Sequence, residues 1–117
     1  TSNLSEEEIQ RAMRDAAVFA GQDKERKAAL EALNAAEAAL YRVNTALGSK
    51  AGKELDRETK GKIKEAERNL EKVTRHKKAE KLTPADVQAI NAAREALSAI
   101  ATPLVTRWES EQASQAK

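Results

Sequence analysis

The sequence lacks cysteine altogether, and among its 117 residues it has one each of His, Met, Phe, Trp and Tyr. Without cysteine, neither a disulfide framework nor a thiolate metal site can form. The lone His76 supplies one imidazole where a structural zinc site needs about four ligands, so we expect no metal site. A Ser/His/Asp pattern and a Gly-rich phosphate loop are missing too. We therefore expect no catalytic residue, no bound cofactor and no enzymatic activity in this chain itself.

Long apolar runs are also missing. No run approaches the ~18 residues that a membrane-spanning helix requires, and no signal peptide is visible. We expect a cytoplasmic protein without membrane contact.

Glycine and proline are scarce, with four and two residues, and strand signals are absent. Neither a β-branched run nor a sustained alternation of apolar and polar residues indicates a strand. Ala, Glu, Lys, Arg, Leu and Gln dominate, and all are strong helix formers. The composition predicts an all-α fold with narrow seams between helices, because large apolar side chains are too few for a thick core.

The first helix has a clear start signal. Ser5 is a good N-cap residue with Glu8 three positions on, which is the spacing of a capping box. Leu4 and Ile9 can close a hydrophobic staple around this cap. Apolar residues at steps of three and four predict a helix over residues 5–20.

Two further helices and a loop follow. Gly21 costs roughly 1 kcal/mol relative to alanine inside a helix, so we expect a bend there. A long second helix is predicted over residues 22–47, and residues 48–53 form the clearest loop. A third helix starts near Asp56, a plausible N-cap, and continues to about Lys78.

The fourth helix has the strongest start signal of all. Thr83 is a suitable N-cap, Pro84 occupies the first helical position, and Asp86 lies three residues past the cap. Pro103 falls inside the apolar stripe and should bend or interrupt the helix. The stripe ends at Trp108, so we expect the tail of residues 109–117 to fray.

These elements predict an N-terminal helical arm followed by an antiparallel three-helix bundle, because short connections favour antiparallel neighbours. Residues 1–21 would form the N-terminal helix, 22–47 the helix linking arm and bundle, and 48–108 the helices that complete the bundle. The predicted core consists of apolar residues at helical spacing, namely Leu30, Leu33, Leu40, Leu47, Ile63, Leu70, Val73, Val87, Ile90, Leu97, Ile100 and Leu104.

The arm has an apolar face without a partner in the chain. Leu4, Ile9, Met13 and Phe19 form this face, and the bundle is complete without them. An amphipathic helix with a bare apolar face needs a partner. In the isolated chain that partner could be a second copy, so we expect a homodimer at high concentration.

The net charge is only +2, but residues 48–82 carry twelve Lys and Arg against seven Asp and Glu. Such a segment could bind nucleic acid by neutralising phosphates. However, it has no aromatic residue to stack on bases, and the seven acids are interleaved. A solvated helix face is the better interpretation, and we expect no nucleic acid partner.

The segment from Leu4 to Ala16 resembles the opening of the α-helical lid in DnaK-type chaperones, the heat-shock protein 70 family. The resemblance covers nearly the whole chain.

A second part of the resemblance lies in the long helix. The family pattern there is Asn, an acid three residues on and an aromatic or His four further on, and it matches Asn34, Glu37 and Tyr41. On periodicity alone, Glu37 and Tyr41 are an ordinary solvated acid and an aromatic at the bundle edge. The resemblance instead implies a latch: Glu37 pairs with an arginine of a peptide-binding β-sandwich, and Tyr41 contacts an outer loop of that sandwich.

The resemblance implies that the chain is one part of a larger protein-folding and stress-response machine. Its partners would be the β-sandwich and the ATPase domain of the same parent chain and, indirectly, unfolded client peptides. The lid would close over peptide when ADP occupies the ATPase domain and swing away when ATP does, with ATP and Mg²⁺ bound in that separate domain. A self-associating helical adaptor without a peptide-gating role remains the alternative.

Overall fold

The computed structural model describes residues 5–115, which fold into helices without a strand and so confirm the all-α prediction. The elements in chain order are α1 (Glu6–Gly48), α2 (Lys50–Lys53), α3 (Arg57–Thr74), the 3₁₀ helix η1 (Ala79–Lys81) and α4 (Pro84–Gln115).

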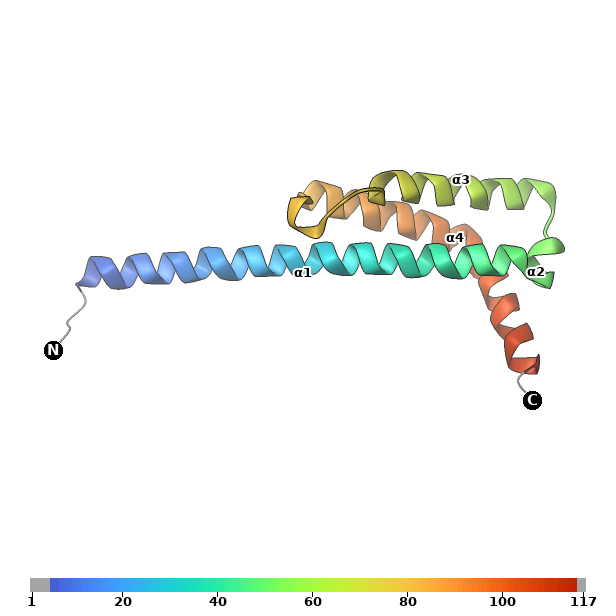
Figure 1. Cartoon of the computed structure of the whole chain (residues 1–117), viewed down its shortest axis with the longest axis horizontal. Helices are drawn as coiled ribbons and strands as arrows, with labels where there is room; N and C mark the ends of the chain where they lie inside the picture. The colour runs from blue at the N-terminus through green and yellow to red at the C-terminus, as the bar shows by residue number, and fades with distance from the viewer. Residues whose placement is uncertain (1–4, 116–117) are drawn as a thin grey trace.

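The molecule consists of a projecting arm and a three-helix bundle (Figure 1). The bundle forms where α3 and α4 pack along the C-terminal half of α1, with α3 antiparallel to its two neighbours. Every described residue before Ala29 is exposed, so the arm buries no side chain against the bundle. The shape is accordingly long, with extents of 74 × 34 × 21 Å and a radius of gyration of 21.3 Å. A compact domain of about 100 residues would have a radius of about 13 Å.

The arm and the linking helix are one continuous helix, so the predicted bend at Gly21 is wrong. α1 runs through 43 residues without a break. The Ser5 side chain caps its start by accepting a hydrogen bond from the Glu8 backbone N–H at 3.2 Å, as predicted. Leu4, the other half of the predicted staple, lies outside the described residues. A single glycine lowers helix propensity by only about 1 kcal/mol, which strong helix formers on both sides offset.

The seam that α1 presents to the bundle is made mainly of alanine. Its buried residues are Ala29, Ala32, Ala36, Val43 and Ala46. The predicted core residues Leu33, Leu40 and Leu47 are only partly buried beside this seam. Leu30 is 46% exposed and is not a core residue. At about 100° per residue, Leu30 points well away from the centre of this seam and toward solvent.

The other two helices contribute the large buried side chains. Ile63, Leu70, Ile90, Leu97 and Leu104 are all fully buried, as predicted. Val73 and Val87 pack at the edge of the same cluster.

Ile100 was placed in the core by the prediction, but its side chain is 37% exposed. Ala101 takes the buried position instead. On α4, Ala101 lies in line with Leu97 and Leu104, whereas Ile100 lies to one side of that line.

A tight corner joins α1 to α3, where the sequence predicted only a loop. Ser49 ends α1, and its side chain caps the single turn of α2 by accepting a hydrogen bond from the Gly52 N–H at 3.4 Å. Gly52 is buried, and a Cβ atom on it would lie 2.1 Å from the carbonyl oxygen of Leu47. Only glycine fits this approach of two backbone segments.

α3 starts at its predicted cap and ends earlier than predicted. Asp56 Oδ2 accepts from the Thr59 N–H at 3.0 Å, while the helix stops at Thr74 rather than near Lys78. His76 follows with φ of 59°, the left-handed conformation that reverses the chain after many helices. It is a surface residue, as expected.

α4 begins with the predicted capping box. The Thr83 N–H donates to Asp86 Oδ2 at 3.0 Å, and the Asp86 N–H donates to Thr83 Oγ1 at 3.1 Å. These bonds to Thr83 hold the pKa of Asp86 below its ordinary value of 3.8.

Pro103 bends α4 without interrupting it. Proline has no N–H for the carbonyl one turn earlier and crowds that turn. Beyond it the helix turns away from the α1 axis and continues to Gln115 (Figure 1). The prediction of a frayed tail is therefore wrong for residues 109–115, whose Glu, Gln and Ala are good helix formers.

The glycines allow a matched test of the corner. Gly52→Ala should lower the free energy of unfolding by about 1–3 kcal/mol, because two backbone segments must move apart. Gly61→Ala, inside α3 with open space around it, should raise that free energy by about 0.5–1 kcal/mol. Urea denaturation followed by circular dichroism measures both. Equal effects of the two substitutions would contradict the corner geometry.

Glu67 is the one acid buried within the seam of the described bundle. Its burial raises the pKa of the carboxyl group above the ordinary value of 4.5, and Glu71 adds to this while Lys64 opposes it. The charged form is therefore less favourable in the folded chain than in the unfolded chain.

The sign of the pH effect follows from this pKa. The contribution of Glu67 to the free energy of unfolding is fully present below the pKa that its carboxyl group has in the unfolded chain. It is lost as the pH rises through the higher pKa that the group has in the folded chain. Glu67→Gln should therefore unfold at higher urea concentration than the wild type near neutral pH, with the difference shrinking toward pH 4. A difference independent of pH would show that burial does not shift this carboxyl group.

Candidate functional site: the open face of the long helix

The three residues of the predicted latch lie on α1 and are exposed. Asn34, Glu37 and Tyr41 follow one another at steps of three and four, which places them on one side of the helix. Tyr41 is 71% exposed, unusually open for an aromatic residue. Between residues 5 and 115, no hydrogen bond or ion pair engages the side chains of Glu37 or Tyr41.

The apolar residues of the arm lie on the same side of α1. Ile9 is 45% exposed and Met13 is 67% exposed. At about 100° per residue, they point in nearly the same direction as Asn34 and Tyr41. Phe19 lies with Glu37 at the edge of this sector, and the remaining arm residue, Leu4, is outside the described range.

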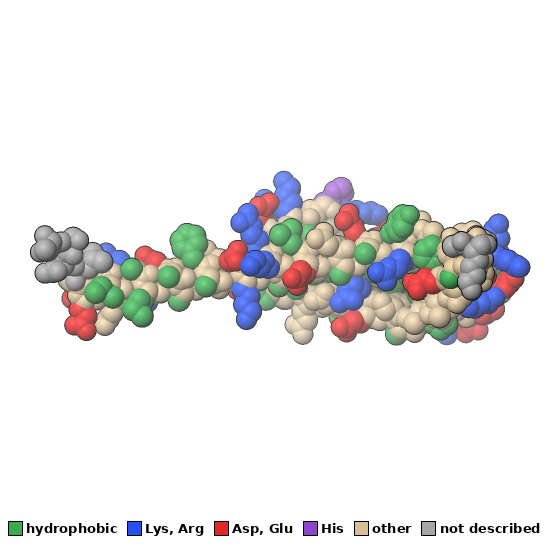
Figure 2. Space-filling model, turned by 90° about the horizontal axis from the view of Figure 1, so that it is seen from below, with side chains coloured by type: hydrophobic (Ala, Val, Ile, Leu, Met, Phe, Trp, Pro, Cys, Tyr) green, Lys and Arg blue, Asp and Glu red, His purple; other side chains and the backbone are tan. Residues whose placement is uncertain are grey.

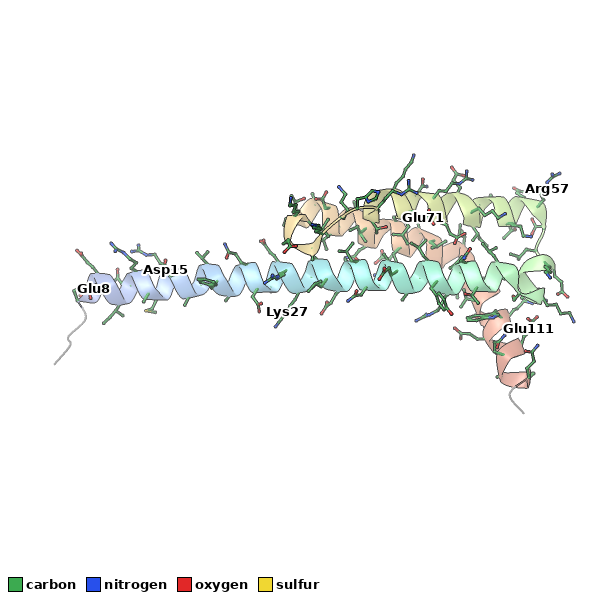
Figure 3. All side chains as sticks on the ribbon, in the orientation of Figure 1. Glu8, Asp15, Lys27, Arg57, Glu71 and Glu111 are labelled. Carbon is green, nitrogen blue, oxygen red and sulfur yellow. The ribbon has the colours of Figure 1, made fainter. Side chains whose placement is uncertain are left out.

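We call these residues the open face: Ile9, Met13, Phe19, Asn34, Glu37 and Tyr41. Helical geometry sets its centre about half a turn away from the buried seam of Ala29, Ala36 and Val43. Figure 3 shows the labelled Lys27 projecting from the side of α1 that faces away from α3, and Figure 2 looks onto that side, where apolar side chains follow the arm.

The open face offers two kinds of contact along one straight helix. Its arm half is apolar, while its bundle half offers an amide, a carboxylate and a phenol. About 48 Å of helix separates Ile9 from Tyr41, so the two halves can bind well-separated parts of one rigid partner. A carboxylate and a phenol can supply one ion pair and one directional hydrogen bond there.

Sequence reasoning found the members of the open face but treated the arm and the latch as separate sites. The assumed bend at Gly21 hid the relation between them. Counting residues around an unbroken helix would have revealed it, since the signal lies in the spacing alone.

Features of other kinds of site are few among residues 5–115. No three His, Asp or Glu side chains in this range gather where they could hold a metal ion. None of its helices is long and apolar enough to cross a membrane.

The fold and the open face describe an all-α module with one long exposed face, and comparisons with known proteins supply its family. A family model described as Hsp70 protein matches residues 1–109. The chain belongs to the Hsp70 family.

Two curated relatives are called chaperone protein DnaK. The chain is 36% identical over 80 residues to that of Thermoplasma acidophilum, which covers 68% of this chain and 13% of the relative. It is also 36% identical over 77 residues to that of Thermoplasma volcanium, covering 66% and 12%. The matched region is thus a small part of each relative. No solved structure matches the chain.

Proposed function

We propose that this chain is the helical lid of a DnaK-type chaperone and closes over peptide held in a separate β-sandwich domain of the same parent chain. The observation that carries the proposal is the open face of α1. It is long, exposed and opposite the bundle, so a second body can dock along it without disturbing the core. A separate ATPase domain, a cytoplasmic location and unfolded client peptides belong to the same proposal through the family resemblance.

The arm and the latch have different roles in this proposal. The apolar arm residues Ile9 and Met13 give a lasting contact with the sandwich, because their burial removes apolar surface from water. Glu37 and Tyr41 add a polar contact near the surface, worth about 1–3 kcal/mol. Such a latch holds the lid closed over peptide and still releases it when the sandwich and the ATPase domain change state.

The latch can be tested in the full-length parent protein. Glu37→Ala and Tyr41→Ala should leave the lid folded, because both side chains lie away from the alanine seam. Peptide release with ADP bound should become faster by a few-fold to about a hundredfold, as expected for a loss of ~1–3 kcal/mol. Stopped-flow fluorescence of a labelled peptide measures the release rate.

Glu65→Ala is the matched control for charge and exposure, since Glu65 lies exposed on α3 rather than on the open face. It should leave the release rate unchanged. The latch assignment is refuted if the two open-face variants release peptide at the wild-type rate, or if the control releases it as fast as they do.

The exposure of the arm also favours a second candidate function, a self-associating adaptor. Without the sandwich, Ile9, Met13 and Phe19 are left in water, and exposed apolar surface of this kind drives association. On either interpretation, the isolated chain should dimerise through α1 at high concentration. The adaptor interpretation further requires that the dimer persist in the full-length parent.

Light scattering at several concentrations tests this association. Serine at both Ile9 and Met13 should abolish the dimer while leaving the helical circular dichroism spectrum intact. Val18→Ser is the control, because Val18 is 58% exposed on the opposite side of the arm, and it should still dimerise. A wild-type chain that stays monomeric at millimolar concentration would rule out the association.

A further inference from the structure

The corner where the arm leaves the bundle contains a continuous groove. Three hollows lie there between residues 22–30 of α1 and residues 78–87. The middle hollow, of about 290 Å³, shares Arg26, Ala79 and Glu80 with a larger one of about 650 Å³. It shares Glu25 and Leu82 with a smaller one of about 130 Å³. The groove therefore passes from one side of η1 to the other.

The two ends of the groove differ in chemistry. The small end is lined by Ala28, Leu82, Pro84 and Val87, with Glu25 as its one charged residue. This end can hold an apolar side chain. The large end is lined by Leu30 together with charged residues of both elements, of which Arg26, Lys27 and Lys78 are basic.

The corner as a whole is basic. Residues 22–30 and 75–87 carry seven Lys and Arg against four Asp and Glu, an excess of three in a chain whose net charge is +2. Figure 2 shows Lys and Arg side chains gathered where the arm meets the bundle.

Two of the four acids in the corner are already engaged. Asp23 pairs with Lys27 at 3.4 Å, and Asp86 caps α4. Glu25 and Glu80 remain as unengaged acids, against several exposed cations.

We propose that this corner groove, defined by Arg26, Leu30, Lys78, Leu82 and Val87, docks a peptide segment that carries an apolar side chain flanked by acidic residues. The apolar side chain enters the end lined by Leu82 and Val87. The acidic flanks lie over Arg26, Lys78 and the basic loop that starts at Arg75. Charge complementarity of this kind speeds association and sets specificity.

A peptide fits the corner better than a nucleic acid does. Residues 22–30 and 75–87 contain no Phe, Tyr or Trp on which a base could stack. Two acids remain among the cations and would repel a continuous phosphate backbone, whereas a peptide can place its own polar residues opposite them.

The groove and the open face use different residues of α1. The small end of the groove, at Ala28, faces the bundle, whereas its large end, at Lys27 and Leu30, reaches the side of α1 that carries the open face. None of the six open-face residues lines the groove, so the proposal holds whether or not the chain is a lid.

Fluorescence anisotropy with the 117-residue chain tests the proposal. The probe is a labelled peptide with two central leucines flanked on both sides by glutamates. We expect saturable binding that weakens as salt is added. The same peptide with lysine in place of glutamate should not bind, and serine in place of leucine should weaken binding about fivefold or more.

Variants locate the site. The double variant Arg26→Gln and Lys78→Gln should weaken binding about tenfold, and Leu30→Ser, at an exposed position, should weaken it about threefold. The control double variant Arg14→Gln and Lys53→Gln removes the same charge from exposed positions outside the groove and should change binding less than twofold.

Several outcomes would overturn the proposal. Equal losses in the groove and control double variants would show that net charge alone attracts the peptide. Tighter binding of a single-stranded oligonucleotide than of the peptide would assign the surface to nucleic acid. An absence of saturable peptide binding at millimolar concentration would show that the groove docks no such segment. Because none of these variants replaces a residue of the open face, failure here leaves the latch experiment unaffected.

Discussion

The close contact between α4 and the alanine seam of α1 is the interaction on which the rest of the structure depends. Ala29, Ala32, Ala36 and Ala46 occupy little space, so α4 can lie near the α1 backbone and cover it with Ile90, Leu97 and Leu104. A chain with few large apolar side chains can pack densely only in this way. The contact also leaves Ile9, Met13, Phe19 and Tyr41 free to form part of a separate face.

The bundle in turn supports the arm. Starting a helix is the costly step, whereas each further residue adds a hydrogen bond at little cost. The bundled half of α1 provides the start, so the arm extends it residue by residue, aided by the Ser5 cap and the Asp23–Lys27 pair. Because the helix is unbroken at Gly21, the direction of the arm is fixed relative to the bundle, and a force on the open face at one end is transmitted to the other.

A few neighbouring residues were enough to predict where the helices start. Which residues are buried could not be predicted in the same way, because burial depends on contacts between helices. The caps at Ser5, Asp56 and Thr83 depend on a few neighbouring residues, so they could be predicted, as could the bend at Pro103. The seam of α1 follows Ala29 and the alanines in line with it, so a core chosen by side-chain hydrophobicity wrongly includes Leu30. The latch residues of the open face were found from a family pattern and its arm residues from their apolar character, but their alignment required knowing that Gly21 does not break the helix.

Both proposed surfaces follow from the geometry of this one helix. Side chains on an α-helix point outward in all directions, so a helix that uses a narrow seam for packing retains most of its circumference for other contacts. Here the seam takes one side, the open face takes the opposite side, and the basic corner occupies the margin where η1 meets α1. A wider, leucine-based seam would have covered part of that margin. The small size of the alanines therefore determines both the packing of the bundle and the number of partners that α1 can contact at once.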